Sequence, residues 1–172
     1  MTTHCWGVDP GFASSPTGVA LVRFDGLAPH LVGAWTIRPR GRDWQARIDD
    51  VLGQLLALIS PRVPVLAPRG PVLLSYELSY IGKNAQSALH LAQLGGGVRG
   101  VALALGLRVV AVQPSESKLA LAGSGAAGKE QMIAAAKQIF GRVLTEHEAD
   151  ACGHALAGEA KVRRQAVERN VT

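Results

Sequence analysis

The sequence predicts an α/β domain built on a mixed central sheet with helices on both faces. Near the N-terminus, runs of apolar and β-branched residues, separated by turn signals such as Asp25-Gly26, predict a three-strand antiparallel meander. Two further short apolar runs, at 72–77 and 107–112, alternate with segments of helical periodicity. That alternation is typical of parallel strands joined through helices, so two parallel strands are expected to extend the meander.

The three strands of the meander are predicted at residues 4–9, 17–25 and about 30–38. A helix is predicted next, from about Asp43 to Ile59, because its apolar residues recur at helical spacing. Pro61 and Pro64 end this helix, and the segment 61–71, rich in Pro, Arg and Gly, is predicted to be a loop.

The second half of the chain alternates strands and helices. Residues 72–77 are predicted as the fourth strand and 107–112 as the fifth, with a long helix from about Asn84 to Leu105 between them. That helix contains Gly95-Gly96-Gly97, and glycines inside a helix cost roughly 1 kcal/mol each relative to alanine. We therefore expect a compensating contact, such as close backbone approach to a partner helix.

Three shorter helical predictions complete the chain. Pro114 opens a short helix, Lys129 begins another after a loop at Ser124-Gly125, and a last helix starts near Thr145 and runs towards Arg164. We expect one domain over residues 1–172, with a basic C-terminal extension at about 159–172.

Composition narrows the functional class. The 172 residues are 48% hydrophobic and carry a formal charge of +5, which suits a partner such as nucleic acid, although many soluble proteins of this charge have no such partner. The two cysteines form no CxxC pair. Without a signal-peptide pattern or a long apolar run, we expect a cytoplasmic protein with no membrane partner.

Four residues far apart in the sequence are candidates for one metal site. Asp9 ends the apolar run that begins at Cys5, and Glu77 ends the run at 72–77. His147 and Asp150 are three positions apart in the last predicted helix, so they share one face of it. Neighbouring strands of the sheet would bring Asp9 and Glu77 together, and the helix face could pack across the strand ends.

This set of residue types suits phosphodiester cleavage. Two divalent ions about 4 Å apart can activate a water molecule and stabilise the leaving oxygen. Mg²⁺ prefers carboxylate oxygens, so holding two ions requires several acidic groups at one place. Acidic ligands inside a basic protein indicate an enzyme that binds a polyanion and cleaves it.

Each candidate also has a simpler interpretation. Asp9 before Pro10-Gly11 suits a turn, Glu77 suits an edge position or an ion pair, and a lone helical histidine such as His147 is most often solvated or packed in a core. Glu146 and Glu148 are rival ligands that spacing alone does not exclude. His154, four residues after Asp150, is within reach of the site, but packing is the favoured interpretation for it.

The chain resembles the RuvC family of Holliday junction resolvases, within the RNase H-like nucleases. The resemblance covers about residues 5–158 and keeps the family's motif order. The motifs are Gly7-Val8-Asp9-Pro10-Gly11 with Thr17-Gly18, Tyr76-Glu77, 83–89, 113–118, Gly123-Ser124-Gly125 with Lys129-Glu130, and 147–151.

This resemblance implies an RNase H-like fold and a homodimer that resolves four-way DNA junctions in recombination and repair. It implies paired nicks that depend on Mg²⁺ or Mn²⁺ and leave 5′-phosphate and 3′-hydroxyl ends. It matches Asp9, Glu77 and Asp150 to the family's catalytic acids and His147 to a position that is aspartate or histidine. DNA contacts are implied for Tyr80, Lys83, Asn84, Lys118 and Lys129. A branch-migration helicase complex is a further implied partner.

Some features leave alternatives open. The turn between Asp9 and Thr17 is longer than the family pattern, which affects the expected local DNA contact. An imidazole at His147 favours Mn²⁺ over Mg²⁺ and predicts lower activity at acid pH.

Three alternative functions remain open. One is an RNase H-like nuclease with another branched-DNA or RNA–DNA substrate, and another is a non-catalytic junction-binding protein. The third is an actin-like ATPase, but that fold needs two such lobes and this chain is long enough for only one.

Overall fold

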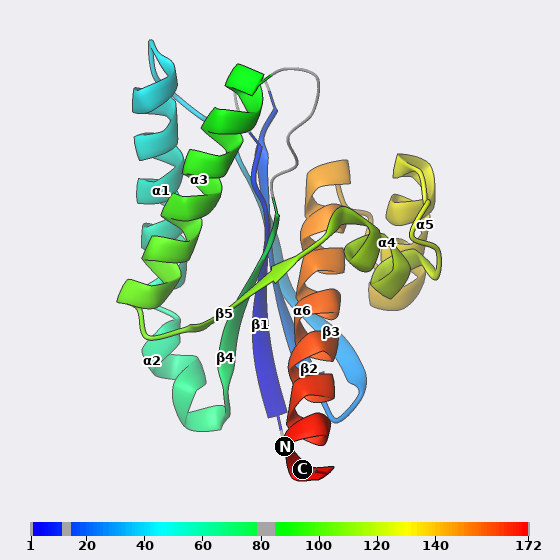
Figure 1. Ribbon diagram of the computed structural model, residues 1–172. Coiled ribbons are helices and arrows are strands. Elements are labelled where there is room, and N and C mark those ends of the chain that lie inside the picture. Colours follow the sequence, from blue (N-terminus) through cyan, green and yellow to red (C-terminus); the bar gives the residue numbers. More distant parts are fainter. Residues whose placement is uncertain (1, 12–14, 79–84, 172) are drawn as a thin grey trace.

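The computed structural model describes residues 2–11, 15–78 and 85–171. Its elements, in chain order, are β1 (Thr2–Asp9), β2 (Thr17–Asp25), β3 (Ala28–Ile37), α1 (Trp44–Ile59), α2 (Val63–Leu66), the 3₁₀ helix η1 (Ala67–Arg69), β4 (Val72–Glu77), α3 (Ala85–Ala104), β5 (Arg108–Val112), α4 (Pro114–Ala122), α5 (Lys129–Phe140) and α6 (Glu146–Val171). Figure 1 shows them as a central sheet between two helical layers.

The sheet has the mixed architecture that the sequence predicts. Its strand order is β3-β2-β1-β4-β5. The first three strands form an antiparallel meander, whereas β4 runs parallel to β1 and β5 runs parallel to β4. The carboxyl ends of β1, β4 and β5 therefore meet at one edge, which is where sites gather in sheets of this kind.

Two apolar cores fix the helices on the two faces. On one face, α1 and α3 pack around Trp6, Val8, Leu55, Leu94 and Val98. On the other face, α4, α5 and α6 pack around a second group that includes Ala20, Leu121, Met132, Ala149 and Cys152. The predicted placement of helices on both faces is thus confirmed.

Alternation along β1 and β4 decides which residues face α6. Successive strand residues point to opposite faces of a sheet. Trp6 and Val8 lie in the α1–α3 core, so Gly7 and Asp9 point to α6. The parallel register pairs Val8 with Tyr76. Glu77 therefore lies level with Asp9 and points to the same side.

Glycines allow α6 to lie directly on the sheet. A Cβ atom at Gly7 would be 1.9 Å from the carbonyl oxygen of Ala151, and one at Gly18 would be 1.9 Å from that of His147. Both positions need glycine because a backbone atom occupies the space of a side chain. This close approach brings the first half of α6 against the last residues of β1 and the first residues of β2.

Two predictions about local structure need correction. Segment 61–71 is not simply a loop, because α2 and η1 occupy most of it; each has a proline in its first turn, where a missing N–H costs nothing. The last helix does not fade near Arg164 but continues to Val171 and includes the basic extension. The remaining predicted elements match the structure within about two residues.

The glycines of α3 have different environments. A Cβ at Gly97 would be 2.4 Å from the side chain of Leu52, so this glycine lets α3 pack against α1. Gly96 and Gly100 meet nothing within 4 Å. Packing within this chain accounts for Gly97 but not for Gly96 or Gly100.

The helical stretch Trp44–Arg69 is long and apolar enough, by length and composition only, to cross a membrane. Its residues Ile48, Val51, Leu55 and Ile59 are buried against the sheet. Core packing accounts for these four residues, whereas 22% of the apolar window as a whole is buried. The cysteines Cys5 and Cys152 are both free and buried, as expected without a disulfide framework.

Candidate metal centre and nucleic-acid interface

The turn after β1 holds Asp9 at the edge of the sheet. The Gly11 N–H donates to Thr17 Oγ1 at 3.1 Å, and the Thr17 hydroxyl donates to the Gly11 carbonyl at 3.2 Å. Thr17 is fully buried, so this pair of bonds closes the chain between β1 and β2. The Asp9 side chain is 17% exposed and points towards α6.

A capping box sets the start of α6. The Thr145 N–H donates to Glu148 Oε2 at 2.9 Å, and the Glu148 N–H donates to Thr145 Oγ1 at 3.3 Å. The Thr36 hydroxyl donates to the other Glu148 oxygen. Glu146 forms an ion pair with Lys129 at 2.7 Å. Glu148 is thus held in the capping box, whereas Glu146 pairs with Lys129 near His147 and Asp150. Asp150 is close enough to Asp9 and Glu77 for their charges to interact.

Three side chains converge where β1, β4 and α6 meet. One ligand atom each from Asp9, Glu77 and His154 lies within 4.8 Å of the other two. His154 Nε2 is 3.5 Å from Glu77 Oε2 and 3.9 Å from Asp9 Oδ1. His154 is fully buried, whereas Glu77 is 34% exposed and opens the cluster to solvent.

His147 lies beside this cluster and contacts the other oxygen of Asp9. Its Nδ1 is 3.0 Å from Asp9 Oδ2, a hydrogen bond in which the ring N–H donates. The two oxygens of Asp9 therefore have different neighbours: Oδ2 faces His147 and Oδ1 faces His154. This hydrogen bond joins residues 138 positions apart in the sequence.

The pKa of Asp9 is lowered from its ordinary value. Burial acts to raise it, but the hydrogen bond from His147 and the nearby His154 ring outweigh burial. The same bond raises the pKa of His147. Asp9 is therefore ionised at neutral pH.

Glu77 and Asp150 are shifted in the opposite direction. Burial raises the pKa of Glu77, and the negative charges of Asp9 and Asp150 add to the effect. Burial followed by the Asp9 charge raises the pKa of Asp150. Several acids thus share one small space, and their mutual repulsion is a cost that a bound cation would remove.

These residues fit a divalent cation. The donor set consists of carboxylate oxygens and imidazole nitrogens, which are common ligands of Mg²⁺, Mn²⁺ and related ions. The buried ring nitrogens of His154 have no hydrogen-bond partner within the described ranges, so the site offers an unused ligand. The cluster of Asp9, Glu77 and His154 could therefore hold a divalent cation.

The raised pKa values predict a specific pH dependence of activity. Protons and a cation compete for Glu77, Asp150 and His147, whose protonated forms the fold favours. The single-turnover cleavage rate should therefore fall as the pH is lowered from neutrality, and a higher Mn²⁺ concentration should move the midpoint to lower pH. A rate that stays constant down to the ordinary carboxylate range of about pH 4 would contradict this prediction.

The predicted DNA-binding residues divide into two groups. Lys118 in α4 is close enough to Glu77 to affect its pKa, and Lys129 at the start of α5 is 76% exposed beside Glu146. Both lie near the acidic cluster. Tyr80, Lys83 and Asn84 lie outside the described residues.

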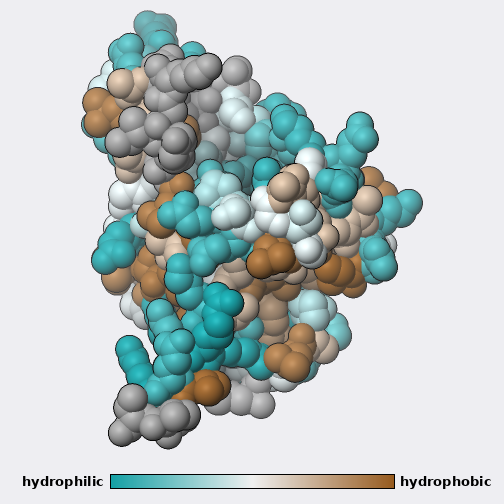
Figure 2. All heavy atoms as spheres, turned by 45° about the vertical axis from the view of Figure 1, so that its right-hand side comes forward, coloured by the Kyte–Doolittle hydropathy of each residue, from teal (hydrophilic) through white to brown (hydrophobic). Residues whose placement is uncertain are grey.

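The basic C-terminal segment is partly engaged within the chain. Lys161 donates to the Ala111 carbonyl and pairs with Glu116 at 3.4 Å. Arg163 contacts Glu159 and the Gly26 carbonyl. On the side turned forward in Figure 2, hydrophilic and hydrophobic side chains are interspersed over the surface.

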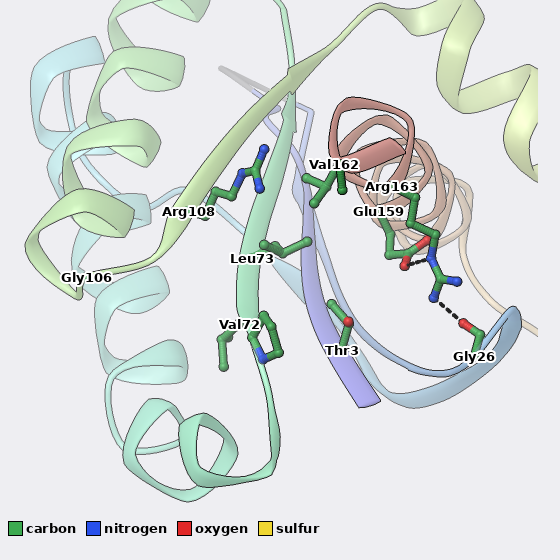
Figure 3. A pocket seen from close by; sticks show the side chains of 11 residues that line it. Thr3, Gly26, Val72, Leu73, Gly106, Arg108, Glu159, Val162 and Arg163 are labelled. Carbon is green, nitrogen blue, oxygen red and sulfur yellow. Dashed lines mark hydrogen bonds and ion pairs between the residues drawn. The ribbon is translucent and has the colours of Figure 1, made fainter. Parts of the chain in front are cut away.

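A large cavity lies away from the acidic cluster. It has a volume of about 660 Å³ and lies at the opposite end of the sheet, between the starts of β1, β4 and β5 and the middle of α6. Figure 3 shows Leu73 and Val162 lining it, with Arg163 reaching across to Glu159 and Gly26. Of the predicted site residues that the structure describes, none lines this cavity.

His154 is the residue that sequence reasoning undervalued. Packing was the favoured interpretation, but the structure places its ring between Asp9 and Glu77. His147, Asp150 and His154 are spaced i, i+3 and i+7, which puts all three on one helix face. That spacing is the signal that identifies it.

Comparison with known proteins identifies related chains. The model of a family described as "Crossover junction endodeoxyribonuclease RuvC" matches residues 5–158. A protein of that name from Chlorobium phaeobacteroides (strain DSM 266 / SMG 266 / 2430) is 32% identical over 166 residues, covering 94% of this chain and 84% of its own length. One from Nitratidesulfovibrio vulgaris (strain DP4) is 35% identical over 135 residues, covering 78% and 76% respectively.

Solved structures agree with the fold. The structure of Thermus thermophilus RuvC in complex with Holliday junction substrate matches with a TM-score of 0.74 and 24% identity, over 94% of this chain and 96% of that one. A second structure of Thermus thermophilus RuvC gives a TM-score of 0.73 at 23% identity, with the same coverage. These likenesses confirm the predicted RNase H-like fold.

Proposed function

Because the chain belongs to the RuvC family, we propose that it is a crossover junction endodeoxyribonuclease that resolves four-way DNA junctions. The observation that carries this proposal is the convergence of Asp9 and Glu77 at the ends of parallel strands, opposite His147 and Asp150 on α6. The reaction is hydrolysis of a phosphodiester to a 5′-phosphate and a 3′-hydroxyl, in paired nicks that serve recombination and repair.

Each site residue has a proposed role. Asp9, Glu77, His147 and Asp150 hold Mg²⁺ or Mn²⁺, two ions in each active site. When bound, such ions make water a better nucleophile and stabilise the leaving oxygen. The hydrogen bond from His147 fixes the orientation of the Asp9 carboxylate and keeps it ionised.

The lysines beside the site are proposed to contact DNA. Lys118 and Lys129 would place positive charge close to the scissile phosphate, where neutralisation of phosphates supplies much of the affinity for DNA. Tyr80, Lys83 and Asn84 are proposed to contact the junction on the basis of the family resemblance. We further propose a cytoplasmic, nucleoid-associated setting and a branch-migration helicase complex as a partner.

The central experiment compares a labelled synthetic four-way junction with a matched linear duplex, in Mg²⁺, Mn²⁺ or EDTA. Paired symmetric nicks are expected on the junction only, and only with a metal ion. Metal-dependent cutting of forks, flaps or RNA–DNA hybrids in preference to the junction would replace the resolvase with a related nuclease. Tight junction binding without cutting in either metal would replace it with a non-catalytic binding protein.

We also propose that the protein is a homodimer whose interface includes α3. Gly96 and Gly100 leave open space on the outside of this helix, and Leu89 and Leu103 are more than half exposed on it. A second helix could approach closely there and bury these apolar side chains, which would account for the glycines that packing within the chain leaves unexplained.

The dimer can be tested by introducing leucine at Gly96 and, as a control, at Gly53. Gly96→Leu should convert a dimer to a monomer in light scattering, because the added side chain would separate the two α3 helices. Gly53→Leu is the matched control, since Gly53 also meets nothing within 4 Å but lies on α1. A monomeric parent protein at working concentration, or a dimer unaffected by Gly96→Leu, would contradict the α3 interface.

A further inference from the structure

We propose that His154 is an additional metal ligand, whose Nε2 atom coordinates the divalent cation held between Asp9 and Glu77. This inference rests on the proposed function, in which that cation serves phosphodiester cleavage. It goes beyond that function because it gives the site a buried nitrogen ligand in addition to its acids and His147. The occupant it favours is a first-row transition ion such as Mn²⁺.

The burial of His154 is the first observation. Its side chain is fully buried on α6, and neither ring nitrogen has a hydrogen-bond partner among the residues that the structure describes. Leaving a buried polar group without a partner costs its desolvation free energy, so such a group calls for an explanation. A cation between the carboxylates would supply the missing partner of Nε2.

The distances are the second observation. His154 Nε2 lies 3.5 Å from Glu77 Oε2 and 3.9 Å from Asp9 Oδ1, longer than ordinary hydrogen bonds. Ligand atoms roughly 2.1 Å from one ion are about 3.0 Å apart at right angles and about 3.4 Å apart in a tetrahedron. The two distances from Nε2 therefore need to shorten by roughly 0.5–0.9 Å for right-angle coordination, which side-chain movement on binding an ion would supply.

The two histidines occupy different places. His147 uses Nδ1 to hold Asp9 Oδ2, whereas His154 faces Oδ1 of the same carboxylate and also Glu77. Asp9 can thus keep its bond to His147 while its other oxygen points to the cation. His154 is the histidine whose ring nitrogen belongs to the three-residue cluster.

A nitrogen ligand changes which ions the site prefers. Imidazole suits transition ions, whereas Mg²⁺ prefers oxygen donors in a strict octahedral arrangement. His154→Gln should weaken Mn²⁺ binding by at least about 10-fold, the lower end of the loss seen when even a residue supporting a metal ligand is changed. Mg²⁺ binding should change less.

The test uses the full chain without DNA, loaded with less than one equivalent of Mn²⁺. Electron spin echo modulation reports ¹⁴N nuclei bonded to Mn²⁺, and titration calorimetry reports the affinities for Mn²⁺ and Mg²⁺. His154→Gln should lose a ¹⁴N coupling and bind Mn²⁺ more weakly. Unchanged modulation and affinity in this variant would overturn the proposal.

Two further variants separate the histidines from general effects. His147→Asn should keep the ¹⁴N coupling that His154 supplies; if it abolishes all coupling while His154→Gln keeps it, the ligand is His147 and the proposal fails. His4→Gln changes another buried histidine, at the far end of β1, and should leave Mn²⁺ binding unchanged.

The His147→Asn variant also covers the case in which His154→Gln does not fold, because His154 is then the histidine left at the cluster. A folded His147→Asn protein that binds Mn²⁺ without any ¹⁴N coupling would overturn the proposal.

Cleavage measurements distinguish this inference from the proposed function. A protein that cuts junctions but shows no nitrogen coupling from His154 would retain the function and refute the ligand. A protein with the coupling but no cleavage of any branched DNA would retain the ligand and refute the function.

Discussion

Replacing Asp9 by asparagine should lower the rate of junction cleavage by more than about 100-fold, while junction binding is retained. Even residues that only orient metal ligands cost about 10–100-fold in metal affinity or activity when changed. Asp9 has a central position, since one oxygen contacts His147 and the other faces His154 and Glu77. An amide at this position keeps the shape of the side chain but loses its charge.

The measurement pairs single-turnover cleavage with a binding titration on the same junction in Ca²⁺ or EDTA. The melting temperature of Asp9→Asn should stay close to that of the parent in the absence of metal, because relief of repulsion with Glu77 and Asp150 offsets loss of the charged partner of His147. Cleavage within about 10-fold of the parent would show that Asp9 is not essential to the chemistry. Loss of binding together with a lower melting temperature would indicate a folding defect instead.

Gly7→Ala should destabilise the protein by roughly 1–3 kcal/mol and also impair cleavage. The added Cβ would meet the Ala151 carbonyl oxygen at 1.9 Å and the Ala155 N–H nitrogen at 2.8 Å, so backbone has to move. Moving α6 away from β1 separates Asp150 and His154 from Asp9. For a chain of this size, each kcal/mol lowers the melting temperature by about 2–4 °C.

The matched control makes the same substitution where space is open. Gly53 lies on the exposed side of α1 and meets nothing within 4 Å, so Gly53→Ala should stabilise the helix by about 0.5–1 kcal/mol. The two Gly→Ala variants should therefore shift the melting temperature in opposite directions. A Gly7→Ala protein with the parent's melting temperature would show that α6 adjusts without cost.

Most of the fold could be predicted because its signals are local. The meander follows from apolar runs and a turn at Asp25-Gly26, and the strand at 72–77 coincides with β4. The helices α1 and α3 follow from apolar periodicity. The segment at 61–71 was predicted as a loop because prolines end helices, yet the same prolines are tolerated in the first turns of α2 and η1.

The candidate site could be predicted in its residue types but not in its contacts. Asp9, Glu77, His147 and Asp150 stand out as polar residues at the ends of apolar segments or on one helix face. Sequence spacing did not separate Asp150 from Glu146 and Glu148. The structure does so, since the capping box holds Glu148 and Lys129 is the ion-pair partner of Glu146.

By itself, the sequence determined the α/β class, the strand ends that carry Asp9 and Glu77, and the helix that carries His147 and Asp150. Only the tertiary structure decided that His154 belongs with them, because a buried side chain is placed by packing between elements distant in the chain. Gly7 and Gly18 let α6 lie on β1 and β2, and the register of β1 with β4 brings Glu77 level with Asp9. Periodicity gives the face of a helix, but the depth and position at which that face contacts a sheet depend on contacts that the local sequence does not encode.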